Sequence, residues 1–116
     1  QENPKNLKDE PDYQESKKIR GEVEVAREKQ FNRFKGLGIF TNSEMNNKQV
    51  RKFCKINEPA QNFLDNYVSY KKISHRAYFK ILKLARTIAD LDEKEKISLE
   101  NIKEAANYKN DGVLII

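Results

Sequence analysis

The sequence predicts an all-α domain, a bundle of four or five helices. Apolar residues recur at helical spacing in several segments, and residues that favour helix N-termini stand in front of most of them. No run between these segments alternates as a strand would. The chain has 116 residues, 37% of them hydrophobic and 35% charged, which suits one modest core under a heavily solvated surface.

The first predicted helix covers about residues 15–34. Before it, residues 1–14 carry two of the three prolines, many charges and few apolar side chains, so we expect a flexible linker or tail. The Gly36-Leu37-Gly38 segment is expected to end the helix, because glycine readily adopts the positive φ found at helix C-caps. The apolar positions of this helix are Ile19, Val23, Ala26 and Phe34.

Two helices are expected between this stop and residue 70. In the first, Ser43 is the expected N-cap, and the apolar pattern is less regular; it comprises Met45, Val50, Phe53 and Cys54. The second begins at Asn57-Glu58-Pro59, a capping residue followed by a proline in the first turn, where its missing N–H costs little. Its apolar face has the clearest helical spacing in the chain and comprises Ala60, Phe63, Leu64, Tyr67 and Val68.

The central helix is predicted from the N-cap Ser74 to Asp90 or Leu91. One broad apolar stripe indicates a buried face; it comprises Tyr78, Ile81, Leu82, Ala85, Ile88 and Ala89. On the opposite face, at about 100° per residue, Arg76, Lys80 and Lys83 lie within about 60° of one another, with Arg86 further round. This helix therefore combines a core face with a basic face.

The last predicted helix runs from the N-cap Ser98 to Tyr108. Asn101 occupies the position where a full capping box has Glu or Gln. Asn110-Asp111-Gly112 should stop the helix. Residues 111–116 end in an apolar tail, for which packing on the core, edge-strand pairing and disorder all remain open.

Composition restricts the class of protein. The 23 basic and 18 acidic residues give a net charge of +5, which favours anionic partners without proving nucleic-acid binding. With one cysteine, Cys54, the chain has no intrachain disulfide and no multi-cysteine zinc site. There is no transmembrane run and no signal sequence, so we expect a cytoplasmic protein with no membrane partner. Because the chain starts at Gln1 without a processing signal, we interpret it as a fragment of a longer protein.

Few residues offer chemistry of their own. The chain has no Gly-x-x-x-x-Gly-Lys-Ser/Thr loop to hold the phosphates of a nucleotide, and we expect no metal site. Asp90, with Asp92, Glu93 and Glu95, makes an acidic cluster that is best interpreted as a solvated turn, because it lacks the ligand spacing of a calcium loop. No catalytic residue is expected within the chain itself.

Several segments resemble the C-terminal domain of magnesium-chelatase-like AAA+ ATPases of the ComM type. The densest match runs from Ser74 to Leu91. The match extends upstream through Arg20 to Phe34 and through Asn42 to Cys54, and downstream to Tyr108, so that a domain over residues 15–110 is expected. His75, Phe79 and Lys80 depart from the usual pattern of the family.

The resemblance implies an AAA+ lid, the helical subdomain that closes over ATP bound by a core domain. That core, with ATP and Mg²⁺, would belong to the same polypeptide outside this chain, and neighbouring subunits of a ring would be further partners. The resemblance also implies that Arg76, at the position of the family's sensor-2 arginine, contacts the γ-phosphate. It favours a protein linked to DNA processing, with DNA a possible partner.

Two alternatives remain open. The first is a self-contained nucleic-acid-binding module that uses the basic face of helix 74–91; Lys80, Lys83 and Arg86 are its candidates, for DNA or for a neighbouring subunit, although a solvated face is the simpler interpretation. The second is a cysteine-dependent enzyme that uses Cys54, with His75 as a conceivable base, and it requires an exposed, reactive thiol.

Overall fold

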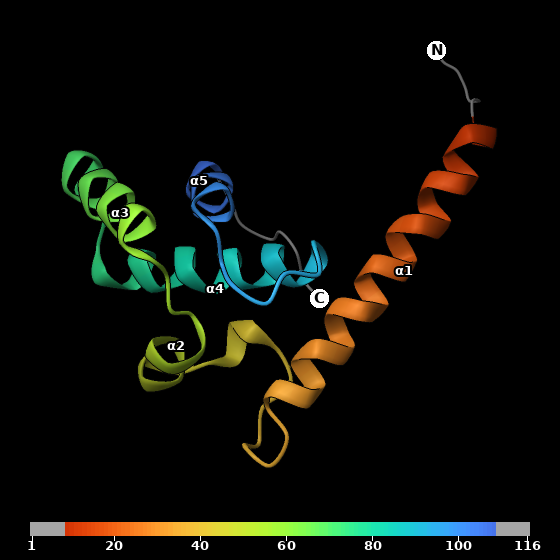
Figure 1. Ribbon diagram of the computed structural model, residues 1–116, viewed down its shortest axis with the longest axis horizontal. Helices are drawn as coiled ribbons and strands as arrows, with labels where there is room; N and C mark the ends of the chain where they lie inside the picture. The colour runs from red at the N-terminus through yellow and green to blue at the C-terminus, as the bar shows by residue number, and fades with distance from the viewer. Residues whose placement is uncertain (1–8, 109–116) are drawn as a thin grey trace.

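The computed structural model describes residues 9–108, and their side chains from residue 20 onward. Within these residues the chain forms five α-helices and one 3₁₀ turn, with no strand, which confirms the predicted all-α class (Figure 1). The elements are α1 (Asp9–Arg33), η1 (Asn42–Glu44), α2 (Asn47–Phe53), α3 (Glu58–Lys71), α4 (His75–Leu91) and α5 (Leu99–Asn107).

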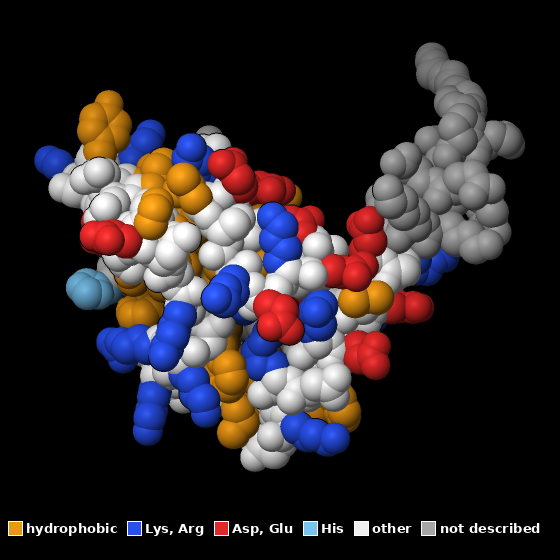
Figure 2. All heavy atoms as spheres, viewed as in Figure 1, with side chains coloured by type: hydrophobic (Ala, Val, Ile, Leu, Met, Phe, Trp, Pro, Cys, Tyr) orange, Lys and Arg blue, Asp and Glu red, His pale blue; other side chains and the backbone are white. Residues whose placement is uncertain are grey.

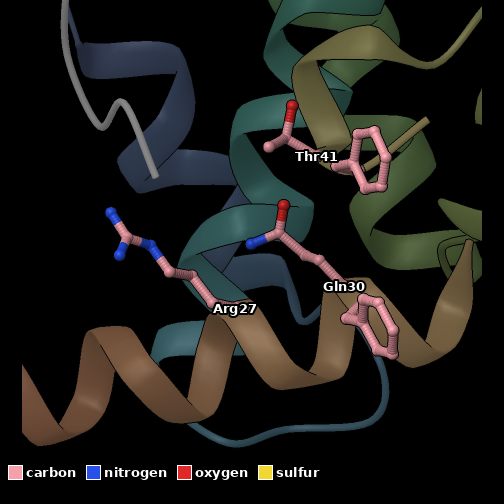
Figure 3. A pocket seen from close by; sticks show the side chains of 5 residues that line it. Arg27, Gln30 and Thr41 are labelled. Carbon is pink, nitrogen blue, oxygen red and sulfur yellow. The ribbon is translucent and has the colours of Figure 1, made fainter.

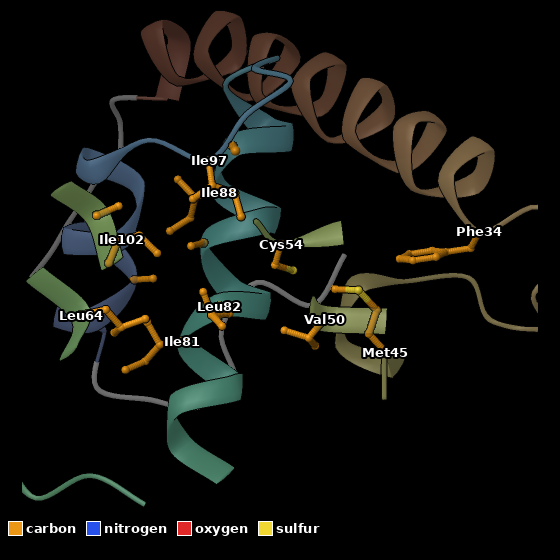
Figure 4. Packing of buried hydrophobic residues seen from close by; sticks show 14 residues of the cluster. Phe34, Met45, Val50, Cys54, Leu64, Ile81, Leu82, Ile88, Ile97 and Ile102 are labelled. Carbon is orange, nitrogen blue, oxygen red and sulfur yellow. The ribbon is translucent and has the colours of Figure 1, made fainter. Parts of the chain in front are cut away.

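Helix α4 lies at the centre and contacts α1, η1, α2 and α5, while α3 packs against α5 (Figure 1). Its predicted apolar stripe is its buried face. Ile81, Leu82 and Ala85 are buried, as are Ile88 and Ala89 one to two turns later. In Figure 4, Ile81 lies beside Leu64 of α3, whereas Val50 of α2 lies on the opposite side of α4. The core is therefore arranged around both sides of α4.

The caps of α3 and α4 are those that the sequence predicts. Asn57 accepts a hydrogen bond from the amide of Ala60 at 3.1 Å, and Ser74 accepts one from the amide of Ala77 at 3.2 Å. Helix α3 ends at Lys71, and Lys72 closes it with a positive φ of 55°.

Two predicted caps differ in the structure. Ser43 does not begin a helix that includes Met45; it lies in η1, and α2 starts after Asn46, whose side chain accepts from the amide of Gln49 at 2.8 Å. At α5, Asn101 completes a capping box with Ser98. An asparagine can replace Glu or Gln there because its oxygen reaches the amide of Ser98, at 3.0 Å.

Helix α1 begins at Asp9, earlier than the predicted start near residue 15 and inside the segment predicted as a linker. It ends at Arg33, and Gly36 and Gly38 both have φ of 80°, which is the stop that the glycines predict. The predicted apolar tail at 111–116 lies outside the described residues, as do residues 1–8.

No helix within residues 9–108 has both the length and the apolar character that a membrane span requires.

Candidate functional site

Arg76 lies in the first turn of α4, two residues after the cap Ser74, and its side chain is exposed. The ion pairs found within the described residues, which join Arg33 and Arg86 to Asp90, do not include Arg76. Backbone N–H groups that point out of a helix N-terminus attract anions, and a guanidinium beside them offers further donors. Within the part of the chain that the structure describes, Arg76 therefore presents a positive group without an ion-pair partner at the end of α4.

The two lysines of the predicted basic face differ in their exposure. Lys80 is exposed, one turn after Arg76. Lys83 is half-buried, and its ammonium donates to the backbone carbonyl of Ser43 at 3.2 Å, which ties α4 to η1.

Arg86 does not lie on an exposed face, contrary to the sequence-based expectation. Only 5% of it is exposed, and it pairs with Asp90 across one turn of α4 at 3.3 Å. Its guanidinium also donates to the backbone carbonyls of Lys94 and Glu95, at 3.0 and 3.2 Å. Burial lowers the pKa of Arg86 from its usual value, while the neighbouring Asp90 opposes that shift. Arg86 is therefore a structural residue that holds the α4–α5 connection.

Asp90 is also buried, although the sequence places it beside the charged turn at 92–95. Its carboxylate accepts two hydrogen bonds from the guanidinium of Arg33, at 2.7 and 2.9 Å, and one from the amide of Asn42 at 2.9 Å. The spacing of Arg86 and Asp90 could have indicated that the two residues pair, since residues four apart share a helix face.

Two further polar residues complete a buried network that joins α1, η1 and α4. Asn42 donates its backbone amide to the side chain of Gln30 at 2.8 Å and its side-chain amide to Thr87 at 3.0 Å. Both Gln30 and Asn42 are almost fully buried. The second half of α4 is thus fixed to the end of α1 by hydrogen bonds between buried groups.

A second group of exposed cations lies on the outer side of α2. The group, named here the α2 basic stripe, has the spacing i, i+3, i+4 and i+7 and comprises Lys48, Arg51, Lys52 and, just after the helix, Lys55. Val50 and Cys54 occupy the buried side. Figure 2 shows Lys and Arg side chains gathered on the part of the surface where α2 and the first turns of α4 lie in Figure 1.

Cys54 and His75 do not form a catalytic pair. Cys54 is buried with 4% exposure, and burial raises the pKa of its thiol to about 12, so that almost no thiolate forms at neutral pH. His75 is exposed at the start of α4. The described residues contain no group of His, Cys, Asp and Glu side chains that could hold a metal ion. The cysteine-enzyme hypothesis requires an exposed, reactive thiol, and the buried Cys54 does not meet that requirement.

A shallow pocket of about 280 Å³ lies between the last turns of α1 and the segment before η1. Its lining residues are Arg27, Gln30, Phe31, Phe40 and Thr41 (Figure 3). None of these residues is an acid, a thiol or an imidazole, so the pocket offers one guanidinium and no catalytic base. It includes none of the site residues predicted from the sequence.

Comparison with known proteins places this fold in a family. The family described as magnesium chelatase, subunit ChlI C-terminal, matches residues 13–109. The uncharacterized protein YifB of Escherichia coli strain K12 is 33% identical over 98 residues, which are 84% of this chain and 19% of YifB. The competence protein ComM of Haemophilus influenzae is 34% identical over 94 residues, which are 81% of this chain and 18% of ComM.

The YifB protein of Salmonella typhimurium is similar at 30% identity over 98 residues. This chain spans about a fifth of the length of these relatives. The match covers α2 to α5 completely and most of α1, and the helical fold agrees with it. The chain therefore belongs to the magnesium-chelatase-like AAA+ family, as its helical C-terminal domain.

Proposed function

We propose that this domain is the lid of an AAA+ ATPase. It closes over ATP that a core domain elsewhere in the same polypeptide binds, and Arg76 contacts the γ-phosphate as a sensor-2 arginine. Neighbouring subunits of a ring respond to this closure, in a cytoplasmic protein linked to DNA processing. The family match and the name of one relative, competence protein ComM, support this proposal.

The observation that carries the proposal is the position of Arg76. It is exposed at the N-terminus of α4, and no Asp or Glu occurs between Asp65 and Asp90. A forked, permanently charged guanidinium suits the oxygens of a phosphate, and the dipole of α4 favours the same anion. Arg76 and the N-terminus of α4 therefore fit the phosphates of ATP. They do not fit Mg²⁺, which prefers carboxylate oxygens, so the core must supply the ligands of the metal.

The packing of α4 makes Arg76 suitable for reporting on a bound nucleotide. The second half of the helix is fixed to α1 and η1 through Asp90 and Asn42, so α4 moves together with these elements. A contact between Arg76 and a phosphate at one end of α4 would then reposition the domain as a unit when that phosphate is cleaved.

Steady-state ATP hydrolysis by the full-length protein tests this function. We expect Arg76→Ala to lower kcat about 100-fold or more, because the charge that develops on the phosphate loses a preorganised donor. ATP should still bind, since the core holds most of the nucleotide. Lys103→Ala, which removes an exposed cation from α5, should leave turnover unchanged.

Both variants must assemble as the parent protein does. Unchanged turnover in a correctly assembled Arg76→Ala protein would reject the sensor assignment. A loss of turnover in Lys103→Ala of the same size would show that any lost cation impairs the protein.

A second candidate function is binding to nucleic acid through the α2 basic stripe together with Lys80. The observation in its favour is that no acidic residue occurs between Glu44 and Glu58, although four cations do. The structure changes which residues this candidate uses, because Arg86 is buried and Lys83 bonds to η1. Its test is described below with the charge distribution of the whole molecule.

A further inference from the structure

Arg51 lies where the α2 basic stripe meets the first turns of α4. The centre of its guanidinium is 5.6 Å from the centroid of the Phe79 ring, within the range of a cation–π contact. Phe79 follows Arg76 by three positions on α4. Residues three apart are neighbours on a helix surface, with about 5–6 Å between their Cβ atoms. Arg51 of α2 therefore contacts a ring that lies one turn after Arg76 on α4, although the two arginines come from different helices.

The Phe79 ring is itself held in place. It packs edge-on against Tyr78, with ring centroids 5.4 Å apart and an angle of 86° between the planes. The hydroxyl of Tyr78 accepts a hydrogen bond from the side chain of Gln61 at 3.2 Å, which connects this aromatic pair to α3. Arg51 of α2 thus rests on a ring that α4 carries and that α3 supports through Gln61.

Helix α2 is also anchored beneath Arg51. Val50 and Cys54 are buried on its inner side, and the side chain of Asn46 caps its N-terminus. Arg51 is exposed on the outer side. A short helix held in this way presents Arg51 at a defined place.

Among the side chains that the structure describes, no carboxylate pairs with Arg51 or Arg76. The sequence has no Asp or Glu from residue 45 to 57 or from residue 66 to 89, the segments that carry Arg51 and Arg76. The ion pairs of the described residues leave out both arginines. Like charges near each other are unfavourable, and an anion bound between them removes that cost.

We propose that Arg51 is a second residue that contacts the γ-phosphate of ATP, alongside Arg76. This inference rests on the proposed lid function. Two guanidiniums, one from α2 and one from the N-terminus of α4, approach the same phosphate from two sides. Phe79 is a positioning residue, because it orients Arg51 without touching the nucleotide. The site thereby distinguishes ATP from ADP by charge at two points.

Nucleotide affinity of the full-length protein tests the inference without relying on turnover. Binding of fluorescent ATP and ADP analogues is measured for the parent protein and for Arg51→Ala. We expect ATP affinity to fall about 10-fold, the usual effect of removing a hydrogen bond to a charged group, and ADP affinity to stay within about 2-fold. Arg51→Lys should recover only part of the loss, because lysine lacks the fork.

The matched control is Lys103→Ala. Lys103 is an exposed cation of α5 that lies over the half-buried ring of Phe63 at 5.8 Å, so its removal costs a similar cation–π contact far from Arg76 in sequence. This variant should bind both nucleotides as the parent does. Equal melting temperatures of the variants exclude a loss of fold.

Three results would overturn the inference. ATP affinity that is unchanged in Arg51→Ala shows that Arg51 does not contact the nucleotide. Equal losses for ATP and ADP place it elsewhere than the γ-phosphate, and a loss of nucleic-acid binding alone assigns it to a different ligand. In each case a collapse of turnover in Arg76→Ala would still support the lid function, so the two proposals fail separately.

Discussion

Asp90 is the residue on which the polar interior depends. It is fully buried, yet its two oxygens accept hydrogen bonds from Arg33 and Asn42 and pair with Arg86. A buried carboxylate is tolerated only when partners replace the water that it loses. Here two arginines and one amide do so, and the partners come from three separate parts of the chain.

Asp90→Ala should lower the free energy of unfolding by about 3–5 kcal/mol, because it leaves Arg33 and Arg86 as unpaired charges in a largely buried place. Urea denaturation of the chain measures the change. Glu95→Ala, which removes an exposed carboxylate from the neighbouring turn, should stay within about 0.5 kcal/mol of the parent. A loss below about 1 kcal/mol for Asp90→Ala would mean that water replaces the carboxylate at little cost.

At the scale of the elements, η1 lies between α1 and α2, and the side chain of its last residue, Glu44, closes it back on its start. The carboxylate of Glu44 accepts from the backbone amides of Phe40 and Thr41 at 2.6 and 2.9 Å. These two hydrogen bonds lower the pKa of Glu44 below its ordinary value of 4.5, and the one from Phe40 has the larger effect. Asn42 of the same turn enters the buried network, so the cap of η1 supports the polar interior.

The lowered pKa of Glu44 predicts a pH-dependent contribution to stability. The ionised carboxylate stabilises the folded chain above pH 4.5, and this stabilisation is lost as the pH falls through the lowered pKa. Glu44→Gln should therefore unfold at a lower temperature than the parent at pH 7, and the difference should shrink below pH 4.5. Melting curves from pH 7 to pH 2 measure it. A difference that is constant with pH would contradict the assignment.

At the scale of the whole molecule, α2 exposes cations but no large apolar side chain. The exposed large apolar side chains within the described residues are Phe31, Leu37, Phe40, Tyr70 and Tyr108, none of which lies on α2. Protein interfaces usually have an apolar centre, whereas nucleic-acid interfaces are polar and strongly positive. If the stripe binds a macromolecule, the lack of an exposed large apolar side chain on α2 favours nucleic acid over protein.

Salt dependence tests this second candidate. If the four cations of the stripe each neutralise one phosphate of duplex DNA, the affinity of the full-length protein should fall about 100-fold between 50 and 200 mM salt. Replacing Lys52 and Lys55 by alanine should reduce the salt slope by about two. Replacing Lys94 and Lys96, which changes the net charge equally, should not. Binding that does not depend on salt would exclude the stripe as a phosphate-binding surface.

Much of the fold could be read from the sequence because the relevant interactions are local. The spacing of Ile81, Leu82 and Ala85 sets the buried face of α4, and the caps Ser74 and Asn57 act within one turn. The glycines at 36 and 38 stop α1 through their own φ angles. The predicted cap at Ser43 is wrong because Ser43 lies inside η1, and Asn46, three residues later, caps α2 in a capping box with Gln49.

The polar interior and the contact of Arg51 with Phe79 depend on packing between distant segments. Arg33 and Asp90 are 57 positions apart, and no local pattern indicates that they meet. The same is true of Arg51 and Phe79, which come from different helices. Sequence spacing places charged residues on helix faces, since it follows from helix geometry alone. Whether a charge such as Arg86 is buried or exposed follows from which other helix covers that face, and this is a property of the assembled domain.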